Sequence, residues 1–158
     1  SGKFLSAEHF GVKANITTLA KGLAGGVPIG ACLADEKCCD VLTKGTHGST
    51  FGGNPISCAG GNAVLKKLSA PGFLDEVSEK GKYLKNKLLE SDEIEKVDGM
   101  GLMLGASLKT KNAPDVVKAA LDNGLLLLTA KEKLRFLPPL TISYDEIDKG
   151  IKILKTKQ

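Results

Sequence analysis

The chain has 158 residues, of which 42% are hydrophobic, 25% charged and 4% aromatic, and its formal net charge is +4. This composition is typical of a globular protein, and no apolar run approaches the ~20 residues that a membrane-spanning helix needs. The lysines are scattered along the chain, Arg135 is the only arginine, and aromatic residues are few. We therefore expect neither a nucleic-acid-binding surface nor a membrane partner.

The first part of the chain predicts two strands joined by a glycine-rich turn. Residues 16–19 form an apolar run that favours a buried strand, and residues 28–34 predict the next strand. Lys21 lies between them, directly before the flexible stretch Gly22–Gly26. Because burial disfavours the charged form of a lysine, a partly buried Lys21 would supply a neutral, nucleophilic amine.

The segment after these strands is expected to be a short helix, capped by Asp35 and running through Leu42. Cysteines occur in and around it without the regular spacing of a disulfide framework, so we expect free thiols in a cytoplasmic protein. A zinc site remains an alternative, although no Cys-x-x-Cys pair supports it. Its ligands would be Cys32, Cys38, Cys39 and His47.

A loop rich in glycine and hydroxyl side chains occupies residues 44–55. Ser49 and Thr50 lie in this loop, and hydroxyls with open backbone N–H groups commonly bind phosphate. A lysine with a phosphate-binding loop suggests pyridoxal phosphate. Alternatively, Ser49 and Thr50 only stabilise a turn or cap the helix predicted from Pro55 to about Leu68. His47 is equally consistent with packing of the loop, and we assign it no catalytic role.

The second half predicts a small α+β domain in which helices cover one face of a mainly antiparallel sheet. Pro71 is expected to open an amphipathic helix. The later elements expected are strands at 94–97 and 102–108, a helix at 114–123, strands at 125–129 and 133–137, and a helix at 144–155. Gly124 fits the left-handed residue that ends a helix, and Ser143 with Glu146 forms a capping-box pattern.

Arg135 is the one basic position at which this lysine-rich chain uses arginine. A guanidinium is a planar fork that binds a carboxylate through two parallel hydrogen bonds. Pro138 and Pro139 stiffen the backbone that follows it. The sequence therefore favours a carboxylate-binding role for Arg135, and a structural ion pair with Asp or Glu is the alternative.

Several ordered blocks, taken together, resemble the fold-type I, class III aminotransferases, which use pyridoxal 5'-phosphate (PLP). These blocks cover nearly the whole chain and are Thr18–Leu23, Val27–Ala31, His47–Pro55, Val97–Met103 and Arg135–Leu140. The resemblance implies an α/β fold in which residues 1–65 are the C-terminal portion of the PLP-binding large domain. Residues 66–158 would then be the small C-terminal α+β domain.

The resemblance also implies roles for individual residues. Lys21 would be the catalytic, cofactor-carrying lysine, and Ser49 and Thr50 would bind the cofactor phosphate of the neighbouring subunit in a homodimer. Arg135 would bind the carboxylate of amino-acid and 2-oxo-acid substrates. Family chains are roughly two to three times this length, against a usual domain size of ~100–150 residues, so we expect a fragment that is inactive in isolation.

The activity implied is transfer of the terminal amine of N-acetylornithine to 2-oxoglutarate in arginine biosynthesis. Ornithine, succinylornithine and 4-aminobutyrate are alternative donors, because some positions depart from the family pattern. Asp98 stands where an arginine is usual, and Ser107, Ala24 and Lys131 also differ. A phosphate-binding module without catalysis is a further alternative, although neither glycine-rich loop carries a nucleotide-binding motif.

Overall fold

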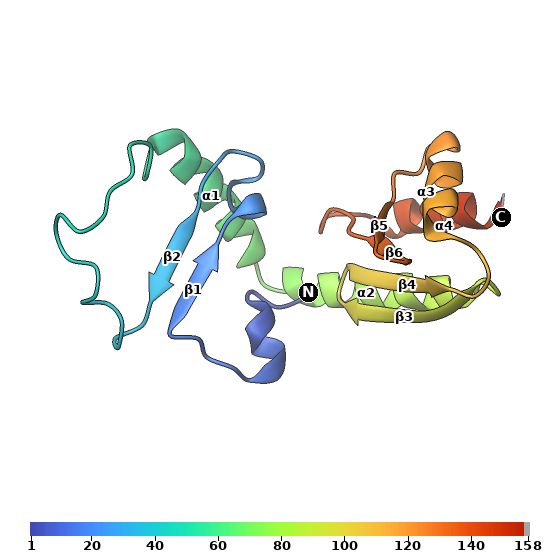
Figure 1. Cartoon of the computed structure of the whole chain (residues 1–158), viewed down its shortest axis with the longest axis horizontal. Helices are drawn as coiled ribbons and strands as arrows, with labels where there is room; N and C mark the ends of the chain where they lie inside the picture. The colour runs from blue at the N-terminus through green and yellow to red at the C-terminus, as the bar shows by residue number, and fades with distance from the viewer. Residues whose placement is uncertain (157–158) are drawn as a thin grey trace. The chain divides into compact units, whose positions relative to one another are not determined.

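The computed structural model describes residues 1–156, which divide into two compact units. Unit 1 comprises Ser1–Gly2 and the residues from Leu74 onward, and unit 2 comprises Lys3–Phe73. Figure 1 shows the elements of both units in chain order from blue to red. The assignment of the chain to parts of a cofactor-binding domain and a small domain stays a prediction.

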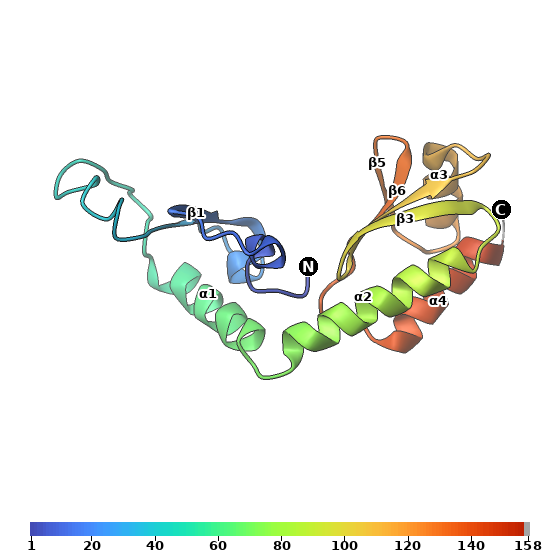
Figure 2. The same cartoon turned by 90° about the horizontal axis from the view of Figure 1, so that it is seen from below.

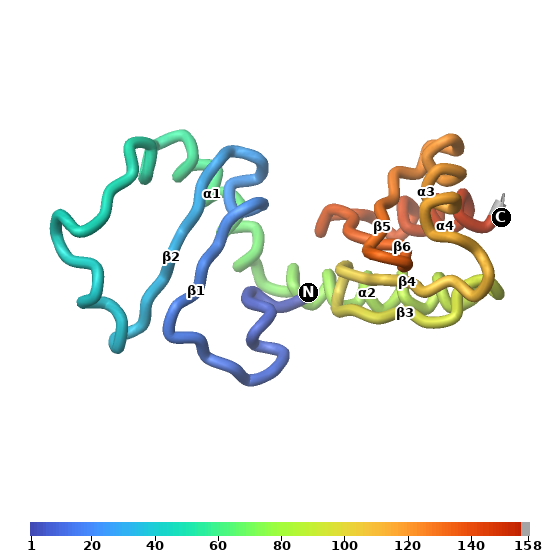
Figure 3. Tube along the Cα trace, viewed as in Figure 1, coloured from blue at the N-terminus to red at the C-terminus, as the bar shows by residue number. Residues whose placement is uncertain are grey.

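Unit 2 is built on a two-stranded sheet and one helix. Strand β1 (Ile16–Leu19) pairs antiparallel with β2 (Ala31–Ala34), and the short 3-10 helix η2 (Lys21–Ala24) lies between them. Another 3-10 helix, η1 (Ser6–Phe10), precedes β1, and α1 (Pro55–Leu68) packs against η2. Figure 3 follows the long loop that connects β2 to α1. The helix predicted from Pro55 to about Leu68 is therefore confirmed.

The expectation that β1 is buried is wrong, because Ile16 is 55% exposed. Within residues 3–73 only Ala24, Ser57 and Gly61 are buried. A two-stranded sheet with one helix offers little surface on which to bury apolar side chains. Unit 2 consequently exposes many apolar side chains, among them Phe10, Val12, Leu33, Val41, Leu42, Phe51 and Ile56.

The expected helix from Asp35 to Leu42 is also wrong, since this segment forms successive turns. The Asp35 carboxylate accepts a hydrogen bond from the backbone N–H of Lys37 and another from the Asn15 side chain. Val41 and Leu42 are exposed, so the segment has no apolar surface against which a helix could pack. Short helices without such packing are marginal in water.

Unit 1 contains a four-stranded antiparallel sheet in the order β3-β4-β6-β5. Its strands are β3 (Ile94–Met100), β4 (Met103–Leu108), β5 (Leu128–Ala130) and β6 (Lys133–Phe136). Its helices are α2 (Phe73–Leu89), α3 (Ala113–Asp122) and α4 (Tyr144–Thr156). These elements confirm the prediction that helices and an antiparallel sheet make up the second half of the chain.

The hydrophobic core of the described chain lies in unit 1. Helices α2 and α4 run side by side beneath the sheet in Figure 2. The Tyr83 hydroxyl of α2 donates a 2.7 Å hydrogen bond to Asp148 of α4, and its ring meets Tyr144 edge-on. Apolar residues of one sheet face and of the helices are buried together: Val77, Leu84, Leu88, Val97, Leu104, Ala106, Leu134, Phe136, Ile147, Ile151 and Leu154.

Two short-range sequence signals in unit 1 are confirmed. Gly124 ends α3 with φ 83°, a conformation that glycine adopts without strain. The backbone N–H of Ser143 donates to the Glu146 carboxylate, and the Glu146 N–H donates to the Ser143 hydroxyl, as a capping box requires.

Among residues 1–156, no helix combines the length and the apolar character that crossing a bilayer would require.

Candidate functional site

Lys21 begins η2 immediately after β1, and its backbone has φ 54°. Residues other than glycine adopt this left-handed conformation at a cost, and such strain is concentrated at functional sites. The side chain is exposed, so the expectation of partial burial is wrong; unit 2 has few residues that could cover it. No hydrogen bond or ion pair links the Lys21 amine to another residue within the described part of the chain.

Helix α1 supports the turn that carries Lys21. A Cβ atom on Gly60 would lie 3.0 Å from the Ala24 carbonyl oxygen, so any larger residue there would push α1 and η2 apart by a few tenths of an ångström. The buried Ser57 hydroxyl donates a 2.9 Å hydrogen bond to the Pro28 carbonyl, just after the turn. These contacts fix the segment around Lys21 against a rigid element.

The same helix holds the loop that carries Ser49 and Thr50. Asn54 is the N-cap of α1, because its side chain accepts a 2.9 Å hydrogen bond from the Ser57 N–H. The Asn54 amide also donates to the Phe51 carbonyl. The alternative that Ser49 or Thr50 caps α1 is therefore wrong. Both residues are exposed, and their hydroxyls have no hydrogen-bond partner among residues 1–156.

Asn54 and Ser57 thus connect the two segments that the sequence singled out. Neither residue was expected from the sequence to have such a role. The pair Asn54-Pro55 was the available signal for the cap, because Asn favours the N-cap position and Pro the first helical position. The hydrogen bond from Ser57 to Pro28 joins residues 29 positions apart, and no local pattern indicates it.

Arg135 lies on β6 in unit 1, and we describe its surroundings within that unit. It is half-buried and stands in register with Gly105 on β4 and Leu128 on β5. No Asp or Glu of the described chain forms an ion pair with it, so the alternative of a structural salt bridge finds no partner there. The guanidinium is therefore available to an external anion.

A largely apolar cavity of about 410 Å³ adjoins Arg135. Leu126, Leu128, Leu137 and Pro139 contribute to its wall, and the first three are exposed. A guanidinium beside such a wall suits a molecule that combines a carboxylate with an aliphatic chain.

An ion cluster lies on the same face of the sheet as Arg135. The Asp98 carboxylate of β3 receives the Lys133 ammonium at 2.6 Å and the Lys96 ammonium at 2.8 Å. The hydrogen bond from Lys133, followed by that from Lys96, lowers the pKa of Asp98 to about 2. Asp98 is consequently ionised at physiological pH, and the two ammonium groups balance its negative charge.

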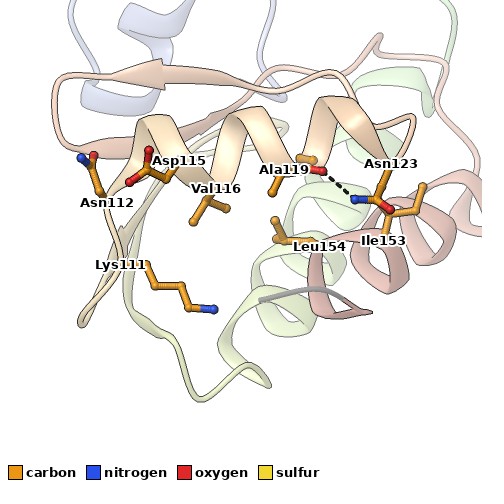
Figure 4. Close-up of a pocket in the computed structure, with 9 residues that line it drawn as sticks. Lys111, Asn112, Asp115, Val116, Ala119, Asn123, Ile153 and Leu154 are labelled. Atoms are coloured by element: carbon orange, nitrogen blue, oxygen red, sulfur yellow. Dashed lines mark hydrogen bonds between the residues drawn. The ribbon is translucent and has the colours of Figure 1, made fainter.

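A second cavity, of about 240 Å³, lies between α3 and α4 (Figure 4). Its wall combines apolar side chains with Lys111, Asp115 and Asn123, whose amide donates a 2.8 Å hydrogen bond to the Ala119 carbonyl. None of the residues singled out from the sequence lines it. The four cysteines are free thiols, and no cluster of His, Cys, Asp and Glu within residues 1–156 is arranged to hold a metal ion.

Comparisons of the chain with family models and with known proteins agree on one family. Residues 1–157 match the family model described as Aminotransferase class-III. The chain is 48% identical over 155 residues to an acetylornithine aminotransferase of Haemophilus ducreyi, covering 98% of this chain and 39% of that protein. It is 47% identical over 156 residues to the acetylornithine aminotransferase of Aquifex aeolicus, with 98% and 40% covered. The chain thus spans about two fifths of the length of these relatives.

A solved structure matches with similar coverage. The ornithine aminotransferase of Toxoplasma gondii, described with partial occupancy of PLP at its active site, gives a TM-score of 0.86 at 32% identity and covers 97% of this chain and 38% of that chain. Such a likeness supports a shared fold.

Proposed function

This chain belongs to the class-III aminotransferase family, and from that premise we propose that it is the part of an acetylornithine aminotransferase that carries the cofactor lysine, Lys21. The reaction would transfer the terminal amine of N-acetylornithine to 2-oxoglutarate in arginine biosynthesis. The acetylornithine aminotransferases of Haemophilus ducreyi and Aquifex aeolicus, with which the chain shares nearly half of its aligned residues, support the proposal. The observation that carries the proposal is an exposed amine on a strained turn, unpaired within the described chain and fixed by α1.

The residues present fit PLP. A primary amine without a partner among the described residues can bond covalently to the aldehyde of the cofactor, and the hydroxyls of Ser49 and Thr50, which lack partners within the same residues, can donate to a phosphate. When bound, the cofactor supplies an electron sink for the substrate carbon. The backbone freedom of Gly52 and Gly53 lets the loop approach a phosphate closely.

Lys21 would have two tasks in the reaction. Its Nζ would hold the cofactor through a covalent bond. When released from that bond, the same Nζ would accept a proton from the substrate carbon and later donate it again, which is general base and acid catalysis by one group. Because α1 fixes the turn through Gly60 and Ser57, the amine returns to the same position between these steps.

Arg135 would orient the substrate. Both the amino donor and the 2-oxo acid carry a carboxylate, and a guanidinium without a partner in the described chain can bind it through two hydrogen bonds. The adjoining apolar cavity could hold the aliphatic part of the same molecule. We propose amino acids and 2-oxo acids as the small-molecule partners on this basis.

Measured rates on the complete protein test the proposed reaction. N-acetylornithine, ornithine, succinylornithine and 4-aminobutyrate would each be offered with 2-oxoglutarate, and the acetylated donor should give the highest kcat/KM. Lys21→Ala should abolish turnover, whereas Lys13→Ala, which alters another exposed lysine of unit 2, should leave it unchanged. Absence of activity with acetylated ornithine would refute the proposed donor, and activity in the Lys21 variant would refute the proposed lysine.

We also propose that the protein is a homodimer in which Thr50 serves the partner's cofactor. Mixed dimers of Lys21→Ala and Thr50→Ala chains test this arrangement. If Thr50 acts across the interface, one site of each mixed dimer has both native residues, and about half of the wild-type activity returns. If Thr50 acts within its own subunit, neither site is complete, and mixing restores nothing.

The cellular compartment is a further part of the proposal. Four free thiols, at least two of them exposed, are typical of a reducing environment. We propose the cytoplasm on this observation, and fractionation of the native cells would test it.

A further inference from the structure

The open face of the sheet in unit 1 brings a carboxylate close to the substrate-binding candidate. Asp98 on β3 is in register with Gly105 on β4, and Gly105 is in register with Arg135 on β6. Residues directly opposite each other in a sheet point to the same face, and adjacent strands are about 4.8 Å apart. Asp98 and Arg135 therefore share a face about 10 Å apart, with no side chain between them.

An ion pair between Asp98 and Arg135 would prevent Arg135 from binding a substrate carboxylate. An arginine and an aspartate that extend toward each other across a glycine can form an ion pair, and opposite charges on one sheet face attract. Such a pair would occupy the hydrogen-bond donors that a substrate carboxylate needs. Asp98 and Arg135 nevertheless form no ion pair within the described chain.

Lys133 lies in the position that prevents this pair. It precedes Arg135 by two residues on β6 and therefore shares its face. Its side chain crosses Gly105, where a Cβ atom would lie 3.6 Å from the Lys133 Cδ, and its ammonium reaches the Asp98 carboxylate at 2.6 Å. The stem thus fills the space above the glycine, and the ammonium neutralises the carboxylate.

We infer that Lys133 is a positioning residue that keeps Asp98 away from Arg135, so that the guanidinium stays free for the carboxylate of a substrate. This inference rests on the proposed role of Arg135. Lys96 also binds Asp98, but its side chain is 68% exposed and approaches the other carboxylate oxygen. Lys96 therefore neutralises Asp98 without covering the glycine.

The test compares three variants in the complete protein. Lys133→Met keeps an unbranched stem but removes the ammonium. It should raise the KM for both substrates about tenfold while kcat changes little. An effect of this size is ordinary for the coupling between neighbouring charged residues. Asp98→Asn should have a KM for each substrate within about twofold of the wild-type value. The double variant should regain a near-native KM, because no carboxylate then competes for Arg135.

For the variants that contain Lys133→Met, two kinetic outcomes would overturn the inference. The first is a double variant whose KM stays as high as that of Lys133→Met, because Lys133 would then bind substrate itself. The second is an unchanged KM in Lys133→Met. Lys96→Met is the matched control, and it should shift the KM by less than about twofold, in the range of a surface pair; an effect equal to that of Lys133→Met would contradict the positional role.

A crystal structure of the Lys133→Met protein separates this inference from the proposed function. It should show Arg135 within ion-pair distance of Asp98, whether or not the protein transaminates. If wild type has no aminotransferase activity but this contact forms, the proposed function fails while the role of Lys133 stands. If wild type is active and Arg135 stays unpaired in the variant, the role of Lys133 is refuted alone.

Discussion

Substitution of Arg135 offers a test in which binding and stability should respond differently. Arg135→Lys keeps the positive charge but replaces a two-donor fork with a single ammonium. A hydrogen bond to a charged group contributes about 1.5–3 kcal/mol, so loss of one of the two should lower kcat/KM by about 10- to 150-fold. Arg135→Gln also loses the charge and should lower kcat/KM further, for the amino donor and for 2-oxoglutarate alike.

The structure predicts that both variants fold normally. Arg135 has no carboxylate partner in the described chain, so its replacement leaves no protein charge unpaired. The free energy of unfolding should therefore change by no more than about 0.5 kcal/mol, as for substitutions that break no ion pair and leave no cavity. Steady-state kinetics and urea unfolding of the same preparations measure the two quantities.

Lys118→Ala on α3 is the control for a basic residue lost elsewhere in unit 1, and it should leave both quantities unchanged. The reasoning fails if Arg135→Lys retains native kcat/KM. It also fails if Arg135→Gln destabilises the protein by 2 kcal/mol or more, the cost expected for breaking a structural ion pair.

Three further predictions concern packing and charge. Gly81→Ala should destabilise the protein by more than about 2 kcal/mol in urea unfolding, because the new Cβ would overlap the Gly101 backbone. Gly150→Ala, whose Cβ would make an ordinary 3.5 Å contact, should be neutral or stabilise by about 0.5–1 kcal/mol. Equal stabilities of the two variants would contradict the packing described. Gly60→Ala should lower kcat several-fold with a modest loss of stability, because the turn of the candidate lysine must move by a few tenths of an ångström; an unchanged kcat would show that this packing does not position the amine. The stability that Asp98 contributes is complete above its unfolded pKa of 3.8 and is lost as the pH falls toward its folded pKa of about 2. Asp98→Asn should therefore reduce the pH dependence of the free energy of unfolding in that interval alone. A change in this pH dependence confined to neutral pH would refute the assignment.

The sequence predicted those parts of the fold that depend on neighbouring residues. The helix Pro55–Leu68 and the Ser143–Glu146 capping box follow from residues within one or two turns of each other, and both are confirmed. The segment from Asp35 to Leu42 was mispredicted because a helix needs a surface to pack against, and the local pattern does not reveal its absence.

Strand limits depended on pairing that the sequence does not show. The strand expected at residues 125–129 begins only at Leu128, because only Leu128–Ala130 find partners on β6. The strand expected at 28–34 is likewise limited to the four residues that pair with β1. Register between strands is set by the tertiary structure.

In the candidate site, too, local features could be predicted from the sequence and long-range contacts could not. Lys21, Ser49, Thr50 and Arg135 were identified from local composition and from resemblance to a family. The contact of Lys133 with Asp98 joins residues 35 positions apart across two strand pairings, and it became visible only with the register of the sheet. The exposure of Lys21 could not be predicted either, because burial depends on distant parts of a fold.

The central claim is that the cofactor is attached to one particular amine. Reduction of the complete, PLP-loaded protein with borohydride would fix the cofactor on the amine that carries it, and proteolysis with mass spectrometry would locate the label. The account predicts a single labelled peptide, containing Lys21, and loss of that label in Lys21→Ala. A label on any other lysine, or no label in an active protein, would contradict it.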